Sequence, residues 1–269
     1  GDFISILQSI ATTISFGIIL IIFFRRKEKK ELSTRDGFAI VTMGWVAIAI
    51  FSALPFYFSG VLNYTNSFFE AMSGLTTTGA SVLGSTSTLM IEDLPHGILF
   101  WRSFTHFIGG MGIIVFSIAI LPMLGMGGVQ LFRAEVAGPK ADKLTPRVKQ
   151  TAKLLWGIYV GFVLLESLIL RIEGMPWFDS ICHAFGTMAT GGFSTQNDSI
   201  AGYGSLIQWT IIFFMFCAAT NFSLHYYFIA RGKFDYLKDR EFRVYILLVI
   251  IFSGLFFINI INSDSYKFN

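Results

Sequence analysis

The sequence is short of charged residues and of cysteine. Charged side chains make up 14% of the 269 residues and hydrophobic ones 54%, a balance too apolar for a soluble domain of this size. Its two cysteines, Cys182 and Cys217, lie in apolar stretches, which indicates packing roles rather than a disulfide framework or a metal cluster. The histidines lack a metal-binding spacing, and no paired base and nucleophile is present. We therefore expect no enzyme, no cofactor and no transition-metal site.

Long apolar stretches are abundant. A helix needs roughly 20 apolar residues to cross a bilayer. The stretches that meet or approach this length are 3–24, 37–59, 97–121, 152–172, 206–230 and the shorter 244–261. The fold class predicted is therefore an all-α integral membrane protein with six spans. The first stretch is too long for a signal-peptide core and lacks its basic start and cleavage site, so we expect a retained span. Because residue 1 is not methionine, we also expect residues upstream.

Basic residues are missing from alternate loops. Of the twenty Lys and Arg, six lie in 25–35, six in 131–153 and five in 231–243, whereas 59–95 and 173–205 contain acidic residues but no basic one. The positive-inside rule places the three basic loops in the cytoplasm. The two acidic loops then face outward, where their charge raises the local cation concentration.

A polar run, 76–81, lies between two apolar stretches and follows a segment, 66–75, that is too short to cross a membrane. Polar backbone at membrane depth is tolerated where it lines a cavity. A shift of 113 residues superimposes this segment on a second one, 179–194. The matching pairs are Ser67 and Ser180, Ala71 and Ala184, Thr77 and Thr190, Gly79 and Gly192, and Ser81 and Ser194. We interpret this as a repeat of span, re-entrant half-helix, polar loop and span, arranged around a pore.

The composition of the two loops favours a dehydrated monovalent cation. Backbone carbonyls and threonine hydroxyls can replace its water shell, and Gly79 and Gly192 can adopt the backbone angles required. The half-helices 66–75 and 179–187 end at the loops, so the negative ends of their dipoles point at the site. The loops contain no carboxylate, which argues against Ca²⁺ and Mg²⁺.

Several segments resemble the bacterial Trk/Ktr potassium-uptake superfamily. Residues 70–81 resemble its first pore loop and 191–195 its second, while 109–115 and 221–225 are similar to the helices that follow those loops. The additional span at 3–24 favours the TrkH-type branch. The resemblance extends over essentially the whole chain.

The resemblance implies a K⁺-uptake subunit of the bacterial inner membrane, driven by the membrane potential, with Rb⁺ and Na⁺ as further candidate ions. It implies four units around one pore, a homodimer and a TrkA-like cytosolic nucleotide-binding regulatory subunit. By motif, the filter would contain Thr77, Thr78, Gly79, Thr190, Gly191 and Gly192. Ala80 and Phe193 stand where potassium channels have a second filter glycine, so selectivity is expected to be looser.

The expected organisation is a fragment of two units and part of a third. Its parts are an additional N-terminal span (1–34), a first unit (35–130), a cytoplasmic connector (131–150), a second unit (151–232) and a truncated third unit (233–269). Two other functions stay open, namely a Na⁺- or H⁺-coupled secondary transporter, such as a symporter, and a non-conducting scaffold.

Four further features have expected roles. Glu70 either caps loop amides or attracts cations, and Glu166, inside a span, is a candidate for a transport role or for a paired or protonated side chain. Arg102 is expected to snorkel to the headgroups. The glycine cluster at 109–112 indicates close helix packing, with a hinge or gate as the alternative.

Overall fold

A computed structural model describes residues 2–24, 34–84, 90–120, 148–232 and 234–262. All regular secondary structure in these residues is helical, as the sequence predicts. The long helices are α1 (Asp2–Phe24), α2 (Thr34–Ser52), α5 (His96–Ile120), α7 (Val148–Ile172) and α11 (Arg240–Asn262). The shorter ones are α3 (Leu54–Phe58), α4 (Tyr64–Leu75), α8 (Trp177–Met188), α9 (Ser205–Ala218) and α10 (Phe222–Arg231), with single 3-10 turns at Ile91–Asp93 and Tyr236–Lys238. The predicted connector at 131–150 lies almost entirely outside the described residues.

Four described segments are long and apolar enough to cross a membrane. They are Asp2–Phe24, Phe38–Phe58, Lys153–Ile172 and Arg240–Ile261. Each coincides with an apolar stretch recognised in the sequence. Helix α5, of 25 residues, occupies the stretch expected at 97–121.

The stretch at 206–230 differs from its prediction. A continuous span was expected, but the structure divides it into α9, of 14 residues, and α10, of 10. At the break, the Thr220 hydroxyl donates to the carbonyl oxygen of Phe216 (2.9 Å) and the Asn221 side chain donates to Glu241 of α11 (3.3 Å). Residues of both types are less favourable in helix interiors than at helix ends. Helix α9 alone is about 21 Å long, less than the hydrocarbon thickness.

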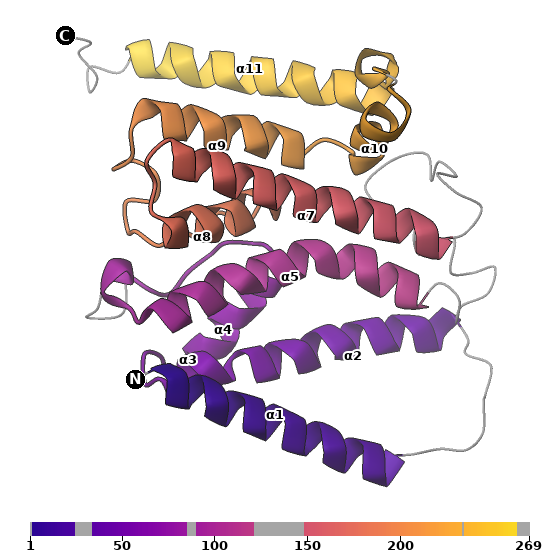
Figure 1. Ribbon diagram of the computed structural model, residues 1–269, viewed down its shortest axis with the longest axis vertical. Helices are drawn as coiled ribbons and strands as arrows, with labels where there is room; N and C mark the ends of the chain where they lie inside the picture. The colour runs from indigo at the N-terminus through magenta and orange to yellow at the C-terminus, as the bar shows by residue number, and fades with distance from the viewer. Residues whose placement is uncertain (1, 25–33, 85–89, 121–147, 233, 263–269) are drawn as a thin grey trace.

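The long helices are arrayed along the long axis of the molecule, from α1 at one end to α11 at the other, and α8 lies between α5 and α7 (Figure 1). The short helix α8 packs against both α5 and α7, and α4 packs against α2 and α5. The two short helices are therefore enclosed between long ones, away from the ends of the array.

The local structure repeats with the period found in the sequence. Adding 113 to the bounds of α4 gives those of α8. The first turns also match, because Ser67 donates to the carbonyl oxygen of Asn63 and Ser180 donates to that of Pro176, both at 2.9 Å. The internal repeat predicted from five residue pairs is thus present in the backbone.

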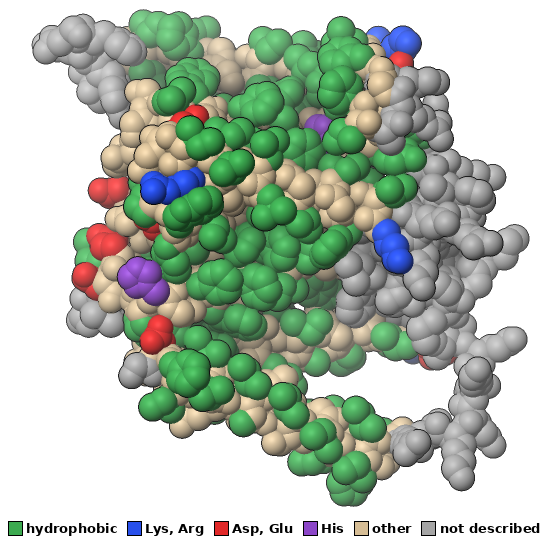
Figure 2. Space-filling view, in the orientation of Figure 1, with side chains coloured by type: hydrophobic (Ala, Val, Ile, Leu, Met, Phe, Trp, Pro, Cys, Tyr) green, Lys and Arg blue, Asp and Glu red, His purple; other side chains and the backbone are tan. Residues whose placement is uncertain are grey.

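Hydrophobic side chains cover much of the described face in Figure 2, and many large apolar side chains on α1, α9 and α11 are exposed. Within the most apolar window of α11 no residue is buried, and in that of α1 only 6% are. Large apolar side chains exposed on this scale are expected where lipid, not water, covers the helix. On the face shown in Figure 2, acidic side chains gather at one end of the helices, on the side where α4 and α8 begin.

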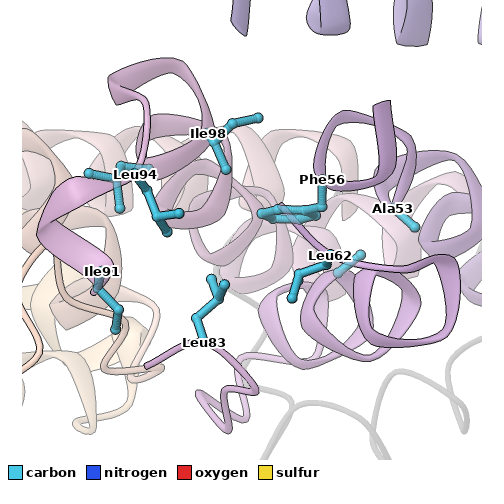
Figure 3. Packing of buried hydrophobic residues seen from close by; sticks show 9 residues of the cluster. Ala53, Phe56, Leu62, Leu83, Ile91, Leu94 and Ile98 are labelled. Atoms are coloured by element: carbon cyan, nitrogen blue, oxygen red, sulfur yellow. The ribbon is translucent and has the colours of Figure 1, made fainter. Parts of the chain in front are cut away.

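A compact apolar cluster joins α3, α4 and the start of α5 (Figure 3). It joins residues of α3, the loop before α4, the loop after it and the start of α5. Its buried members are Ala53, Phe56, Leu62, Ala71, Leu83, Ile91, Leu94, Ile98 and Leu99. The polar loop at 76–81 therefore emerges between two segments that this cluster fixes in place.

Helix α1 is fastened to the same region. Its Asp2 carboxylate accepts the backbone N–H of Gly97 (2.9 Å), in the first turn of α5, and the Ser5 hydroxyl donates to the carbonyl oxygen of Phe58 (3.2 Å). An acidic side chain at a helix N-terminus satisfies an otherwise free N–H and complements the helix dipole.

Candidate functional site

Two polar loops, each at the C-terminus of a short helix, form the candidate site. Helix α4 ends with two backbone bonds, from Thr78 N to Ser73 O (2.9 Å) and from Thr77 N to Gly74 O (3.0 Å). This pattern is a Schellman cap, whose left-handed position is usually glycine. Here it is Thr77, with φ of 54°.

Helix α8 ends in the same way. Gly191 N donates to Gly186 O and Thr190 N donates to Thr187 O, both at 2.9 Å, and Thr190 has φ of 56°. A β-branched residue at positive φ is a genuine outlier, and such outliers concentrate at functional sites. The two threonines are one sign that these loops do more than turn the chain.

A glycine with positive φ follows each threonine two residues later. Gly79 has φ of 74° and Gly192 has φ of 84°. Positive φ at every second residue is neither helix nor strand, and it can turn successive peptide groups toward the same side. Both loops therefore share an irregular, closely matched backbone.

The two loops touch each other. A side-chain carbon placed on Gly79 would collide with the carbonyl oxygen of Gly191. Gly192, in contrast, has open space where its side chain would be, and with Thr190 and Gly191 it lines a cavity of about 660 Å³ that reaches α9 and α11. The structure thus brings the predicted filter residues of one loop against those of the other.

The predicted filter residues are accessible, and the residues behind them are not. Thr78, Thr190 and Gly192 are exposed, while Thr77, Gly79 and Gly191 are partly exposed. The hydroxyl of Thr78 lies 2.8 Å from that of Thr76. Each loop therefore has accessible polar residues on one side and is bonded on the other side to buried side chains, which we call its support.

The support of the first loop is Glu70, which is fully buried. Its carboxylate accepts the Ser81 hydroxyl (2.8 Å) and the backbone N–H of Val82 (3.0 Å). Of the two roles left open for Glu70, capping of loop amides is the one observed. The Ser81 oxygen in turn accepts the N–H of Leu83 (3.1 Å).

The second loop has the same support with a different side chain. At the position equivalent to Glu70 stands His183, whose Nε2 lies 3.1 Å from the Ser194 hydroxyl. Its Nδ1 lies 2.8 Å from the carbonyl oxygen of Asp179, so Nδ1 carries the proton and Nε2 accepts from Ser194. Ser194 accepts the N–H of Gln196 (3.0 Å), as Ser81 does that of Leu83.

Arg102 joins the two supports. Its Nε lies 2.7 Å from Glu70 Oε1, and an Nη group donates to the carbonyl oxygen of Ser194 (2.8 Å). The expectation that Arg102 snorkels to the headgroups was wrong, because only 2% of it is exposed. The cost of a charge at membrane depth could have identified this pair, since such a residue usually has a partner.

Aromatic contacts close the back of the second loop. The Arg102 guanidinium lies 3.7 Å from the centre of the Phe193 ring, and the His106 ring stacks on the same ring at 4.0 Å. His106 also occupies the space beside Gly191. His106 is therefore a buried packing residue. Among the described residues, no group of three or more His, Cys, Asp and Glu side chains is placed to hold a metal.

The glycines of α5 allow the short helices to approach closely. Gly109 faces the backbone carbonyl of Leu75, the last residue of α4, and Gly110 faces Ala189, the cap of α8. Gly112 packs on the Trp45 ring. These contacts support the interpretation of the cluster as a close-packing surface.

Asn197 links the two acidic segments, 59–95 and 173–205. The sequence did not indicate this link. Asn197 accepts the N–H of Ile91 (3.3 Å) on its side chain and donates its own backbone N–H to Glu92 (3.1 Å). The exits of the two loops are thus held together as well.

Glu166 lies in α7 and is fully buried; among the described residues its carboxylate oxygens have no hydrogen-bond partner of good geometry, and the neighbouring polar side chain is Thr187. An unpaired buried charge would be costly, so a neutral isostere should be tolerated. In the full-length protein, for which the sequence predicts cation uptake, we expect Glu166→Gln to keep membrane insertion and that uptake within about twofold of the wild type. Uptake of Rb⁺ by proteoliposomes checks this, with Glu70→Gln as a matched control that removes a fully bonded carboxylate. A severe loss in Glu166→Gln alone would instead assign Glu166 to transport.

Comparison with known proteins supplies the family. The family model described as TrkH, "Cation transport protein", matches residues 4–267. The chain is 45% identical over 248 residues to the Trk system potassium uptake protein TrkH of Salmonella typhimurium, covering 88% of this chain and 50% of that protein. It is 39% identical over 249 residues to the Trk system potassium uptake protein TrkG of Escherichia coli, covering 87% and 50%.

A solved structure agrees with these relatives. The crystal structure of the potassium transporter TrkH from Vibrio parahaemolyticus matches with a TM-score of 0.80 and 35% identity, over 99% of this chain and 54% of that one. The chain therefore spans about half the length of the relatives it matches. With a family model over nearly all its residues and relatives at this identity, the chain belongs to the TrkH family of cation transport proteins.

Proposed function

We propose that the full-length protein containing this chain takes up K⁺ through a pore, and that the two loops form part of its selectivity filter. The filter residues proposed are Thr77, Thr78, Gly79, Thr190, Gly191 and Gly192. One observation supports this proposal most directly. The two loops have the same backbone pattern, each with a threonine and a glycine at positive φ, and they contact each other at Gly79 and Gly191. Exposed carbonyl groups on such loops are suited to replace the water shell of a monovalent ion.

The electrostatics support a cation. Helices α4 and α8 both end at the loops, so the negative ends of two helix dipoles act on the same small region. Glu70 is the acidic residue nearest the first loop, but it is bonded to Arg102, Ser81 and Val82 and leaves the pair neutral. Backbone oxygens without a free carboxylate favour monovalent ions over Ca²⁺ and Mg²⁺. The relatives are named potassium uptake proteins, which favours K⁺ among these ions.

The proposed organisation has six membrane spans and two re-entrant half-helices, α4 and α8, in a bacterial inner membrane. The units proposed are 1–34, 35–130, 131–150, 151–232 and 233–269, with the basic loops 25–35, 131–153 and 231–243 in the cytoplasm. The chain spans about half the length of the relatives it matches, which supports the presence of further units around the loops. We therefore place the chain in a larger array of four units, in a homodimer that works with a TrkA-like cytosolic subunit.

The driving force proposed is the membrane potential, worth about 2.3 kcal/mol per charge for each 100 mV. Coupling to Na⁺ or H⁺, as in a secondary transporter, is the alternative within transport. A carrier would show uptake that depends on a Na⁺ or proton gradient at zero membrane potential. A non-conducting scaffold would show no uptake at all.

Uptake of Rb⁺, a K⁺ substitute, into liposomes that contain the full-length protein tests the proposal. We expect uptake driven by an inside-negative potential, inhibited by K⁺ more strongly than by Na⁺. The Gly192→Asp variant is expected to lower uptake at least about a hundredfold, because it puts a charged side chain at a positive-φ position in the accessible loop. Its side chain enters open space, so insertion should be unaffected. Wild-type uptake by this variant would contradict the filter assignment.

A further inference from the structure

We propose that Arg102 is a positioning residue that fixes the two loops relative to each other and thereby sets the selectivity among alkali cations. The inference rests on the proposed function. It concerns a side chain that faces the back of the loops and makes none of its contacts with the proposed filter residues.

The first step is that one ion pair reaches both loops from behind. On one side, Glu70 holds Ser81 and Val82, which follow the proposed filter segment of the first loop. On the other, Arg102 binds the carbonyl oxygen of Ser194. Each loop is therefore bonded just beyond its proposed filter segment. The 2.7 Å ion pair between Arg102 and Glu70 connects these two sets of bonds.

The second step is the geometry of the guanidinium. Nε is used by Glu70 and an Nη group by Ser194, while the guanidinium carbon Cζ lies 3.7 Å from the centre of the Phe193 ring. A planar group with fixed donor directions can make three such contacts only in one arrangement of its partners. The positions of residues 193 and 194 are thus tied to the position of Glu70.

The third step is that the pair is not required for a half-helix and loop to fold. In the second unit, the position equivalent to Glu70 is His183, which bonds to Ser194 where Glu70 bonds to Ser81, and the described residues show no ion pair at His183. Helix α8 and its cap nevertheless match α4. What the ion pair adds in the first unit is the bridge between the loops.

The fourth step is energetic. A buried ion pair gains little net stability over apolar packing, because both charges lose their hydration, yet removal of one partner leaves an uncompensated charge. Glu70 and Arg102 are 0% and 2% exposed, so both charges have lost their hydration. The pair is therefore better explained by the loop geometry that it fixes than by a gain in folding stability.

The test uses three variants of the full-length protein in liposomes. Arg102→Lys keeps the charge beside Glu70 but not the planar fork. Arg102→Met leaves Glu70 unpaired. The double variant Glu70→His with Arg102→Met installs the histidine found at the equivalent position of the second unit and replaces the arginine by an uncharged side chain of similar length. For each, the amount inserted, the Rb⁺ uptake and the Na⁺ concentration that halves this uptake are measured.

We expect Arg102→Lys and the double variant to insert at the wild-type level and to be inhibited by Na⁺ at concentrations at least about fivefold lower than the wild type. We expect Arg102→Met to lose most uptake. Unchanged Na⁺ inhibition in the inserted variants would overturn the inference, and so would failure of all three to insert, because the pair would then serve folding. Absence of Rb⁺ uptake by the wild type would instead refute the proposed function.

Discussion

Replacement of Gly79 by alanine is expected to abolish Rb⁺ uptake while the protein still inserts. Gly79 has φ of 74°, a conformation that costs an L-residue about 1–2 kcal/mol. In addition, the new methyl group would collide with the carbonyl oxygen of Gly191 in the second loop. Both effects act on the same few atoms, and the collision is with backbone, which cannot rotate away.

Gly192→Ala is the matched variant, because Gly192 also has positive φ, 84°, but has open space at the side-chain position. Backbone strain alone, at about 1–2 kcal/mol, corresponds to roughly a tenfold loss of uptake. The collision at Gly79 should bring its loss to about a hundredfold or more. Rb⁺ uptake per inserted protein measures the difference, and Gly157→Ala in α7, with ordinary φ and open space, should behave as wild type. Equal losses at positions 79 and 192 would show that the two loops do not meet as described.

The parts of the fold that sequence predicts well are those set by local pattern. Long apolar runs determined the spans, and the 113-residue spacing of small and polar residues identified α4 and α8 to within two residues of their observed bounds. Gly79 and Gly192 were correctly expected at special backbone positions, because glycine is the residue that adopts them most readily.

The positive φ of Thr77 and Thr190 could not be predicted from local preference. β-branched residues avoid this region, so a sequence rule would place glycine there. The break at Thr220 and Asn221 was also missed, because an apolar run of sufficient length outweighed two residues that favour helix ends.

The Glu70–Arg102 pair was missed for another reason. Its members are 32 residues apart and lie on different helices, so no periodic pattern connects them. Arg102 was judged from its distance to the end of its own span, whereas its actual partners come from α4 and from the second loop. Two intramembrane charges of opposite sign are a pairing signal that can be applied before the fold is known.

The Gly109→Ala variant is expected to lower both the thermal stability of the detergent-solubilised protein and its Rb⁺ uptake after reconstitution. A methyl group at this position would collide with the carbonyl oxygen of Leu75, the last residue of α4, and would press on the Thr77 methyl group at 3.1 Å. Close contact of a small residue with neighbouring backbone is a common way for membrane helices to pack. Since neither backbone can rotate away, α5 and α4 would have to separate, at a cost of about 1–3 kcal/mol.

Two other helical glycines, Gly112 in α5 and Gly161 in α7, separate this effect from a general one. Gly112→Ala would meet the Trp45 ring, a side chain that can turn, so we expect a smaller loss of stability. Gly161→Ala has open space and should match or exceed the wild type, because alanine favours the helix by up to about 1 kcal/mol. A Gly109→Ala protein as stable as Gly161→Ala would contradict the close contact of α5 with the end of α4. The first loop begins at this contact. A variant that loses stability but keeps full uptake would show that the loop can be displaced without effect on transport. That result would contradict the assignment of the loop to the filter.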